Sequence, residues 1–342
     1  MTVRYPRPLR PGDRIGVTAP SAGVADPLRP RLDFCCSVLR DRGYQVVVGD
    51  CIRADRYVSA PAADRAVELT GMLTDPTIRA IVPPWGGELA VDLLPLLDFA
   101  AIAAAEPTWL VGFSDISTLL TPLTVRTGIA TVHGNNLMDT PYETPAGVVT
   151  WLELVTLPAG ASIEQVSPGR YRRPGFDDWT RDPTVTTMPL TERGSWRRLD
   201  GDGPVEVSGR LLGGCIETMS ALAGSAFGDV TGFARRYAPD GLLVYVEAVE
   251  DNAFSIARQL HGMRLSGFFE AANAVLVGRT RAPGGDGFSQ DDAVLDALGG
   301  LGVPILADVE CGHVAPYLPL VNGARATVRY AGGTGRIEQT LA

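Results

Sequence analysis

The sequence predicts an α/β protein with a parallel sheet in its first half and a second domain after it. Two observations lead to this prediction. Short β-branched runs alternate with helical stretches over the first half of the 342 residues, as in successive βαβ units. A polar segment rich in Pro, Arg, Asp and Thr then precedes a second series of apolar runs. We expect domains at residues 1–162 and 205–342, joined by a connecting segment at residues 163–204.

In the first half, short apolar runs predict strands, and stretches with a helical apolar period predict helices. The strands are expected at residues 14–18, 45–48, 80–83, 109–112 and 129–133, and the helices at 27–42, 62–74 and 115–123. Parallel sheets bind ligands at the carboxyl ends of their strands. The residues that directly follow these strands are therefore the first candidates for a functional site.

The second half repeats the alternation. Strands are expected at residues 205–212, 242–246, 274–277 and 304–307, and helices from residue 216 and at 254–263. The connecting segment has weak periodicity and is long for a plain linker, so we expect it to contribute a functional loop.

Composition excludes several classes of protein. Hydrophobic residues make up 45% of the chain, which is enough to form a core, and the net charge of -9 argues against binding nucleic acid. No apolar run approaches the ~18 residues of a membrane helix, and the first residues have no apolar core of a secretion signal. The five cysteines form no CxxC pair. We expect a cytoplasmic protein with no membrane or nucleic-acid partner.

All 30 basic residues are arginine, because the chain contains no lysine. This excludes a Walker-A phosphate loop, a Schiff-base enzyme and a Ser-Lys hydrolase, which all need a lysine amine. The three histidines are His133, His261 and His313, and none of them stands in a cluster with zinc-ligand spacing. We expect neither a metal nor an organic cofactor.

Two turns at the ends of predicted strands have features of an acyl-transfer site. Ser114 lies between the strand at 109–112 and a helix, where its hydroxyl is exposed beside helix N-terminal N–H groups. An ordinary helix-capping serine is the alternative interpretation. Gly86 and Gly87 follow the preceding strand, and paired glycines let backbone N–H groups approach a substrate oxygen. A plain tight turn explains them equally well.

Two further residues suit a catalytic triad. Glu247 ends the apolar run at 242–246, where a carboxylate can orient an imidazole, and Glu250 is a nearby alternative. His313 follows the strand at 304–307, and His133, at the end of a strand in the first half, is its competitor.

Taken in order, these segments resemble the LD-carboxypeptidase family of serine peptidases, and within it the MccF-like subgroup of microcin immunity peptidases. The resemblance covers nearly the whole chain, through residues 9–21, 86–99, 111–118, 209–225, 244–251 and 305–313. It implies an N-terminal Rossmann-like domain, a smaller β-rich C-terminal domain, an active site between them and a homodimer.

The resemblance also implies roles for single residues. Ser114 matches the nucleophile of the family, His313 its general base and Glu247 the carboxylate that orients the histidine. The oxyanion donors would be the backbone N–H groups of Gly87 and Asp115. The resemblance thus implies a Ser-Glu-His serine peptidase that needs no cofactor.

Two substrate classes follow from the resemblance. The run Pro84-Trp85-Gly86-Gly87-Glu88 is closer to the MccF-like form than to the RGGYG of LD-carboxypeptidases. We therefore expect hydrolysis of the amide between an aspartyl group and a modified nucleotide, with Trp85, Gly86 and Glu88 at the substrate. Trp179 is expected to stack on the nucleobase, or else to pack in the connecting segment. The alternatives are release of terminal D-alanine from murein tetrapeptides and, more remotely, an inactive sensor of muropeptides or nucleotides.

Overall fold

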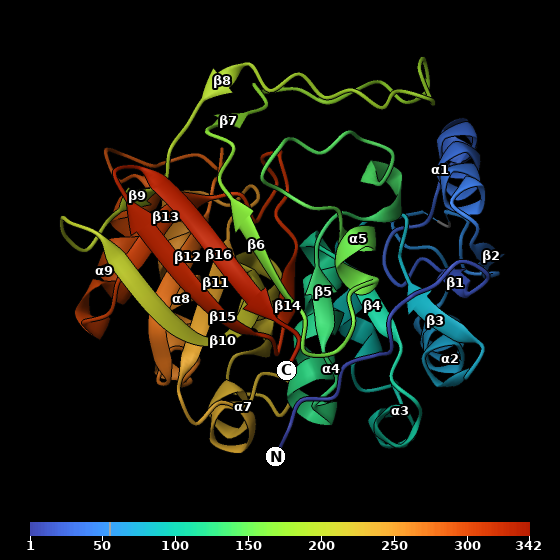
Figure 1. The fold of residues 1–342 in the computed structure, drawn as a ribbon, viewed down its shortest axis with the longest axis horizontal. Helices are drawn as coiled ribbons and strands as arrows, with labels where there is room; N and C mark the ends of the chain where they lie inside the picture. The colour runs from blue at the N-terminus through green and yellow to red at the C-terminus, as the bar shows by residue number, and fades with distance from the viewer. Residues whose placement is uncertain (55) are drawn as a thin grey trace.

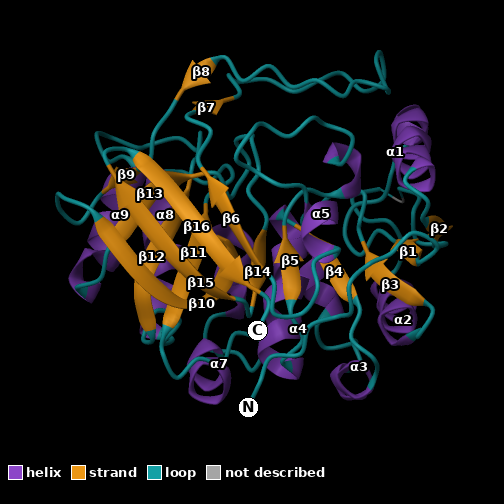
Figure 2. Ribbon diagram, viewed as in Figure 1, coloured by secondary structure: helices purple, strands orange, loops and turns teal. Residues whose placement is uncertain are grey.

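The computed structural model describes residues 1–54 and 56–342 and contains two main sheets (Figures 1 and 2). The strands of the first sheet are β1 (Arg14–Val17), β2 (Gln45–Val48), β3 (Ile78–Ile81), β4 (Trp109–Gly112), β5 (Thr131–His133) and β14 (Leu320–Asn322). Their order is β14-β5-β4-β3-β1-β2, and only the β14–β5 pair is antiparallel. In this doubly wound order the winding direction reverses between β1 and β3, where ligands bind at the carboxyl ends of the strands.

Helices cover the first sheet. They are α1 (Arg29–Asp41), α2 (Ala62–Thr74), α3 (Phe99–Ala104), α4 (Ser117–Thr127) and α5 (Trp151–Val155), with short 3-10 turns at Asp26–Leu28, Ala90–Leu93, Ser114–Ile116 and Leu137–Asp139. Every residue of α4 except Arg126 is buried, as expected of a helix packed on all sides. One of its hydroxyls, that of Thr121, donates to the carbonyl of Gly213 in the second sheet. Helix α4 therefore joins the two sheets.

The second sheet has the order β6-β16-β15-β10-β11-β12-β13-β9. Its strands are β6 (Ser162–Val166), β9 (Arg197–Arg198), β10 (Val205–Cys215), β11 (Leu242–Glu247), β12 (Ala272–Gly278), β13 (Ile305–Val309), β15 (Arg325–Ala331) and β16 (Thr334–Thr340). The four central strands, β10 to β13, are parallel, and the strands outside them are antiparallel to their neighbours. The second half of the chain therefore has its own set of carboxyl strand ends.

The remaining elements accompany the second sheet. They are α6 (Ile216–Met219), α7 (Val230–Tyr237), α8 (Ala253–Leu265) and α9 (Gln290–Leu298), 3-10 turns at Ser220–Leu222 and Gly299–Leu301, and the small hairpin of β7 (Arg170–Tyr171) and β8 (Glu192–Arg193). Side-chain caps fix the starts of the longer helices: Asn252 accepts two backbone N–H groups of α8, and Ser289 forms a capping box on α9.

The predicted fold class is confirmed, since the first sheet is almost wholly parallel, the second has a parallel centre, and helices alternate with the parallel strands of both. The strand expected at 80–83 instead ends at Ile81, because the prolines at 83 and 84 have no N–H to donate to a sheet. The sheets also exchange strands, since β14 completes the first sheet from late in the chain. The domain boundaries at residues 162 and 205 stay a prediction.

The connecting segment crosses from the second sheet to the first. Between β7 and β8 the chain runs along the top of the view toward α1 (Figure 1). It is held there by Arg31 of α1, a fully buried arginine. Its Nε and Nη2 donate to the carbonyl of Met138 at 3.0 and 2.8 Å, and its Nη1 donates to those of Pro183 and Val185 at 3.1 and 2.7 Å. One guanidinium thus ties the segment to α1 and to the loop after β5.

We predict that Arg31→Met releases the segment. The substitution leaves three carbonyls without their donors, so the free energy of unfolding should fall by about 3 kcal/mol. Trypsin should then cleave the native protein at Arg181 faster than it cleaves the wild type. Arg40→Met, on the exposed side of the same helix, is the control and should change neither result. Unchanged cleavage at Arg181 in the Arg31 variant would contradict this role.

Candidate active site

Ser114 occupies a strained turn at the end of β4. Its φ is +63°, a left-handed value that costs energy in a residue with a Cβ atom and is typical of functional sites. Phe113, not Ser114, is the residue that precedes the 3-10 turn, and the serine hydroxyl caps no helix. The interpretation as an ordinary capping serine therefore does not describe this turn. The backbone instead holds the half-buried hydroxyl between strand and helix, as in a nucleophile elbow.

The glycine pair after β3 lies directly against this turn. A Cβ atom on Gly86 would stand 2.8 Å from the Cβ and 2.9 Å from the Oγ of Ser114, so only glycine allows the approach. Among the described residues, the backbone N–H groups of Gly87 and Asp115 have no hydrogen-bond acceptor within the protein. Two free N–H groups beside a serine hydroxyl are what an oxyanion hole requires.

The side chain of Asp115 holds these parts together. Its carboxylate is 1% exposed and accepts hydrogen bonds from the hydroxyl of Ser21 and from the backbone N–H of Ala90 at 2.7 Å. Its other oxygen accepts from Thr118 in α4 at 3.2 Å. The sequence analysis assigned a role only to the backbone of Asp115. The role of the carboxylate could not be found there, because its partners lie in three segments that are far apart in the sequence.

Glu247 and His313 meet at the carboxyl ends of the second sheet. The carboxylate ends β11, is completely buried, and its Oε2 lies 2.9 Å from Nδ1 of the His313 ring. Glycines leave space for it, since a Cβ atom would stand 2.6 Å from Glu247 Cβ at Gly278 and 2.9 Å from Oε2 at Gly312. Glu250, the alternative partner, is exposed and makes no hydrogen bond to the ring.

A distortion of β13 directs the chain toward His313. Asp308 has a φ of +63°, and the pairing of β12 with β13 shifts register next to it. Arg279 donates to both the carboxylate and the carbonyl of Asp308, at 3.1 and 3.0 Å, and Arg197 donates to the same carboxylate. Bulges of this kind re-aim the residues that follow them. Nothing in the spacing of the sequence indicated this clamp.

The His313 ring lies beside the nucleophile turn. Its centroid is 4.9 Å from that of Phe113, the residue before Ser114, and Phe113 also contacts Tyr317. The ring and the Ser114 hydroxyl share no hydrogen bond in the described structure. Such bonds are often long before substrate binds. The structure thus brings Ser114, Glu247 and His313 to one place, from both halves of the chain.

The electrostatics of His313 suit a general base. Burial opposes the imidazolium, but the charge of Glu247 and its hydrogen bond outweigh burial and raise the pKa of His313 above its usual 6.5. A raised pKa means that the protonated ring stabilises the fold below about pH 6.5. That contribution is lost as the pH rises through the folded-state pKa.

His133 has the opposite environment. Burial, with a further effect of the His313 charge, lowers the pKa of His133 to about 3. The ring packs edge-on against Phe113 and Tyr245, and its Nε2 has no hydrogen-bond partner among the described residues. It is a neutral packing residue behind the nucleophile turn. His261 is remote from this turn and pairs with Asp296.

The expected substrate-binding residues fall into two groups. Trp85 and Glu88 flank the glycine pair: the Trp85 indole donates to the carbonyl of Ala22 at 2.9 Å, and Glu88 is exposed. Trp179 belongs to the connecting segment instead. Its indole donates to the Tyr142 hydroxyl at 2.8 Å, and the Arg31 guanidinium lies 5.1 Å from its ring centroid. Trp179 has no ring contact or hydrogen bond with Ser114 or His313 in the described structure.

Acidic groups surround this site. Burial and the charges of Glu250 and Asp115 raise the pKa of Glu88. Burial also raises the pKa of Asp139 to about 6, although the charges of Arg31 and His313 oppose the shift. Among the described residues, no group of three or more potential metal ligands occurs, and no helix has the length and apolar character to cross a membrane.

Comparison with known proteins identifies the family to which the chain belongs. Residues 15–134 match the N-terminal domain of the LD-carboxypeptidase family, and residues 208–328 match its C-terminal domain. A Streptomyces coelicolor relative with a carboxypeptidase name is 30% identical over 96% of this chain and 94% of its own. The Escherichia coli microcin C7 self-immunity protein MccF is 24% identical over 94% of this chain and 92% of its own.

Solved structures share the fold. MccF in complex with glutamyl sulfamoyl guanosine superposes with a TM-score of 0.81 at 22% identity, over 98% of both chains. A muramoyltetrapeptide carboxypeptidase from Oxalobacter formigenes gives 0.68 at 19% identity, over 96% of this chain and 98% of its own. The chain belongs to the LD-carboxypeptidase family of peptidases, and it is an enzyme of the serine carboxypeptidase type.

We predict that His313 and His133 behave differently in an NMR pH titration of ¹³C-histidine-labelled protein. The His313 signal should have its midpoint above pH 6.5, and the His133 signal should not titrate between pH 5 and 8. In Glu247→Gln the midpoint of His313 should move to lower pH, because burial is then opposed by less negative charge. An unchanged midpoint in this variant would contradict the pairing.

Proposed function

We propose that this enzyme hydrolyses the amide between an aspartyl group and a modified nucleotide, using Ser114, His313 and Glu247 as a triad. One observation carries the triad assignment: a fully buried carboxylate holds the His313 imidazole beside a strained serine turn. All three groups come from carboxyl ends of strands, where ligands of parallel sheets bind. Filled triad positions also speak against an inactive sensor.

In the proposed mechanism, His313 removes the proton of the Ser114 hydroxyl while its oxygen attacks the substrate carbonyl. Glu247 accepts from the Nδ1–H, which fixes the tautomer and stabilises the imidazolium. The N–H groups of Gly87 and Asp115 stabilise the oxyanion. His313 then gives its proton to the leaving amine, and a water molecule, deprotonated by the same ring, hydrolyses the acyl-serine. Apart from the water molecule, each step uses only groups that the chain supplies.

Support for a nucleotide leaving group comes from the connecting segment and from the relatives. MccF structures contain glutamyl sulfamoyl guanosine and aspartyl sulfamoyl adenosine. In this chain Trp179 is half-buried, with Arg31 on one side of its ring and Tyr142 at its indole nitrogen. We propose that a nucleobase stacks on the remaining face, an interaction worth ~1–3 kcal/mol in single-strand binders.

A second candidate is release of D-alanine from murein tetrapeptides. It is favoured by an acidic rim at the site, formed by Glu88 and Glu250. Glu88 and Glu250 come from different halves of the chain, yet Glu250 lies close enough for its charge to contribute to the raised pKa of Glu88. Glu217 accepts the backbone N–H groups of Val249 and Glu250, at 2.7 and 3.1 Å, and so holds that rim in place. Negative charge there repels an aspartyl side chain and attracts an acyl residue that carries an ammonium group.

The homodimer and the cytoplasmic location expected from the sequence stay proposals. The five cysteines are all buried and unpaired, which supports a reducing compartment.

We predict that the purified enzyme cleaves aspartyl sulfamoyl adenosine faster than a murein tetrapeptide, with both followed by liquid chromatography and mass spectrometry. Ser114→Ala should lower kcat by a factor of about 10³ or more, because the nucleophile is lost. Ser266→Ala, at the end of α8, is the matched control and should keep wild-type activity. Release of D-alanine alone would establish the second candidate, and equal activity of wild type and Ser114→Ala would contradict the triad.

The double variant Glu88→Gln, Glu250→Gln tests the rim. Using aspartyl and asparaginyl sulfamoyl adenosine as a matched pair, we expect the ratio of their kcat/KM values to shift about threefold to tenfold toward the aspartyl substrate. The reason is that two repelling charges are gone. A constant ratio would show that these carboxylates do not face the acyl group.

A further inference from the structure

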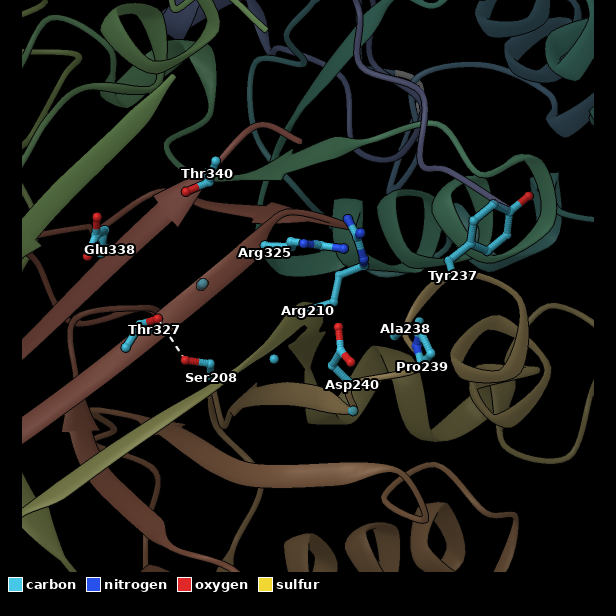
Figure 3. Close-up of a pocket in the computed structure, with 13 residues that line it drawn as sticks. Ser208, Arg210, Tyr237, Ala238, Pro239, Asp240, Arg325, Thr327, Glu338 and Thr340 are labelled. Atoms are coloured by element: carbon cyan, nitrogen blue, oxygen red, sulfur yellow. Dashed lines mark hydrogen bonds between the residues drawn. The ribbon is translucent and has the colours of Figure 1, made fainter. Parts of the chain in front are cut away.

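A cavity lies far from the nucleophile. It has a volume of about 360 Å³ and is lined by residues of β10 and β15, by the loop that leads from α7 to β11, and by two residues of β16 (Figure 3). Gly241 of that loop stands six residues before Glu247 on β11, which places the cavity about 20 Å from the catalytic carboxylate. None of its lining residues belongs to the site described above.

Two arginines stand directly opposite each other in this cavity. Arg210 of β10 and Arg325 of β15 are partners in the antiparallel register, so their side chains leave the same face of the sheet. Like charges in this arrangement destabilise a sheet. Figure 3 shows both guanidinium groups in the cavity. Among the described residues, no side-chain carboxylate forms an ion pair with either one.

Most of their hydrogen-bonding capacity is unused. Arg210 is 7% exposed and donates only through Nη1, to the carbonyl of Gly323, the hydroxyl of Tyr5 at 3.3 Å and the main-chain oxygen of Ala342 at 3.2 Å. Its Nε and Nη2 have no acceptor in the described structure, and neither does the Arg325 side chain. A terminal carboxylate at Ala342 would balance at most one of the two charges. A buried guanidinium of this kind is a strong donor to an oxyanion.

The same cavity also presents a negative group. Asp240 lines it, is exposed, and makes no ion pair with either arginine. Figure 3 shows the Asp240 side chain below that of Arg210 in this view. The other acid in the lining, Glu338, is already paired with Arg329. Groups of opposite charge that share a cavity without pairing leave room for a ligand that contacts both.

We propose that this cavity binds a free α-amino acid. Its carboxylate would accept hydrogen bonds from Arg210 and Arg325, and its ammonium group would face Asp240. The hydroxyls of Ser208 and Thr327, which are 2.8 Å apart on the cavity wall, keep capacity for one further polar contact each. A zwitterion satisfies both signs of charge, whereas inorganic phosphate or acetate satisfies only the arginines and is repelled by Asp240.

The class of the enzyme provides a source for such a ligand. A carboxypeptidase reaction releases a free amino acid, so product would be present wherever the enzyme acts. The binding proposal does not depend on the triad, because it concerns a separate site; the choice of alanine as the probe rests on the second candidate function, release of D-alanine. Its test therefore needs no turnover.

The experiment is isothermal titration of the full chain carrying Ser114→Ala with D-alanine, L-alanine, acetate and inorganic phosphate. We expect saturable binding of an alanine enantiomer, and weaker binding of acetate and phosphate. Arg325→Gln and, separately, Asp240→Asn should each weaken alanine binding about tenfold or more. Arg235→Gln removes an exposed charge of α7 outside the cavity and is the control. Both positions under test are exposed, so these variants should fold, which thermal unfolding checks.

Three results would overturn the proposal. Alanine binding that survives Arg325→Gln would place the ligand elsewhere, for example at the active site. Binding of phosphate or acetate that is tighter than that of alanine would show an anion site without the role given to Asp240. No saturable binding of either enantiomer would leave the cavity without the ligand class assigned to it.

Discussion

The hydrogen bond between Glu247 and His313 is the interaction on which the rest of the structure depends. A completely buried carboxylate is costly unless it is paired, and this one has the imidazole as its partner while its other oxygen has none among the described residues. The surroundings of the pair are shaped around it. Gly278 and Gly312 leave space for the carboxylate, and the bulge at Asp308 directs the following residues so that the ring reaches it. An unpaired charge at this position would destabilise both strands.

The site also depends on how the two halves of the chain are joined. Ser114 belongs to the first sheet and the other two members to the second, so their distance is set by packing between the sheets. Helix α4, which follows Ser114 directly, is buried on nearly all sides and bonds to the carbonyl of Gly213 in β10. The connecting segment adds a second link through Arg31. Both links act close to the carboxyl ends of the strands, where rigidity matters most for an acyl-transfer site.

Much of the fold could be predicted from local pattern. The helix at 62–74 and the strand at 109–112 have the predicted bounds. The spacing of their apolar residues and the residues that flank them determine where these two elements begin and end. The hairpin of β15 and β16 and the helices α7 and α9 were not predicted. Strand β14 pairs with a strand nearly two hundred residues earlier, a pairing that no local pattern reports. The formation of these elements depends on contacts with residues far away in the sequence.

The site, like the fold, contains residues that local sequence patterns predict and residues that they do not. Ser114, Glu247 and His313 stood out in the sequence because each lies at or after the end of a strand in a short, distinctive run; the structure brings them together, and their catalytic roles stay a proposal. The carboxylate of Asp115, the clamp on Asp308 and the buried Arg31 were missed, since each owes its role to partners far away in sequence. Trp179 lies in the segment expected to carry a functional loop, but its contacts are with Arg31 and Tyr142 and not with the triad. Its part in substrate binding stays a prediction.

The most direct test of the account is the rate at which a fluorophosphonate modifies the protein, followed by intact mass and peptide mapping. The account predicts one adduct per chain, on Ser114, with a rate that falls by a factor of about 10² or more in Glu247→Gln and in His313→Asn. Both variants keep the serine, so the loss would report its activation by the pair. Modification of another residue, or an equal rate in all three proteins, would contradict the central claim that the buried pair activates Ser114.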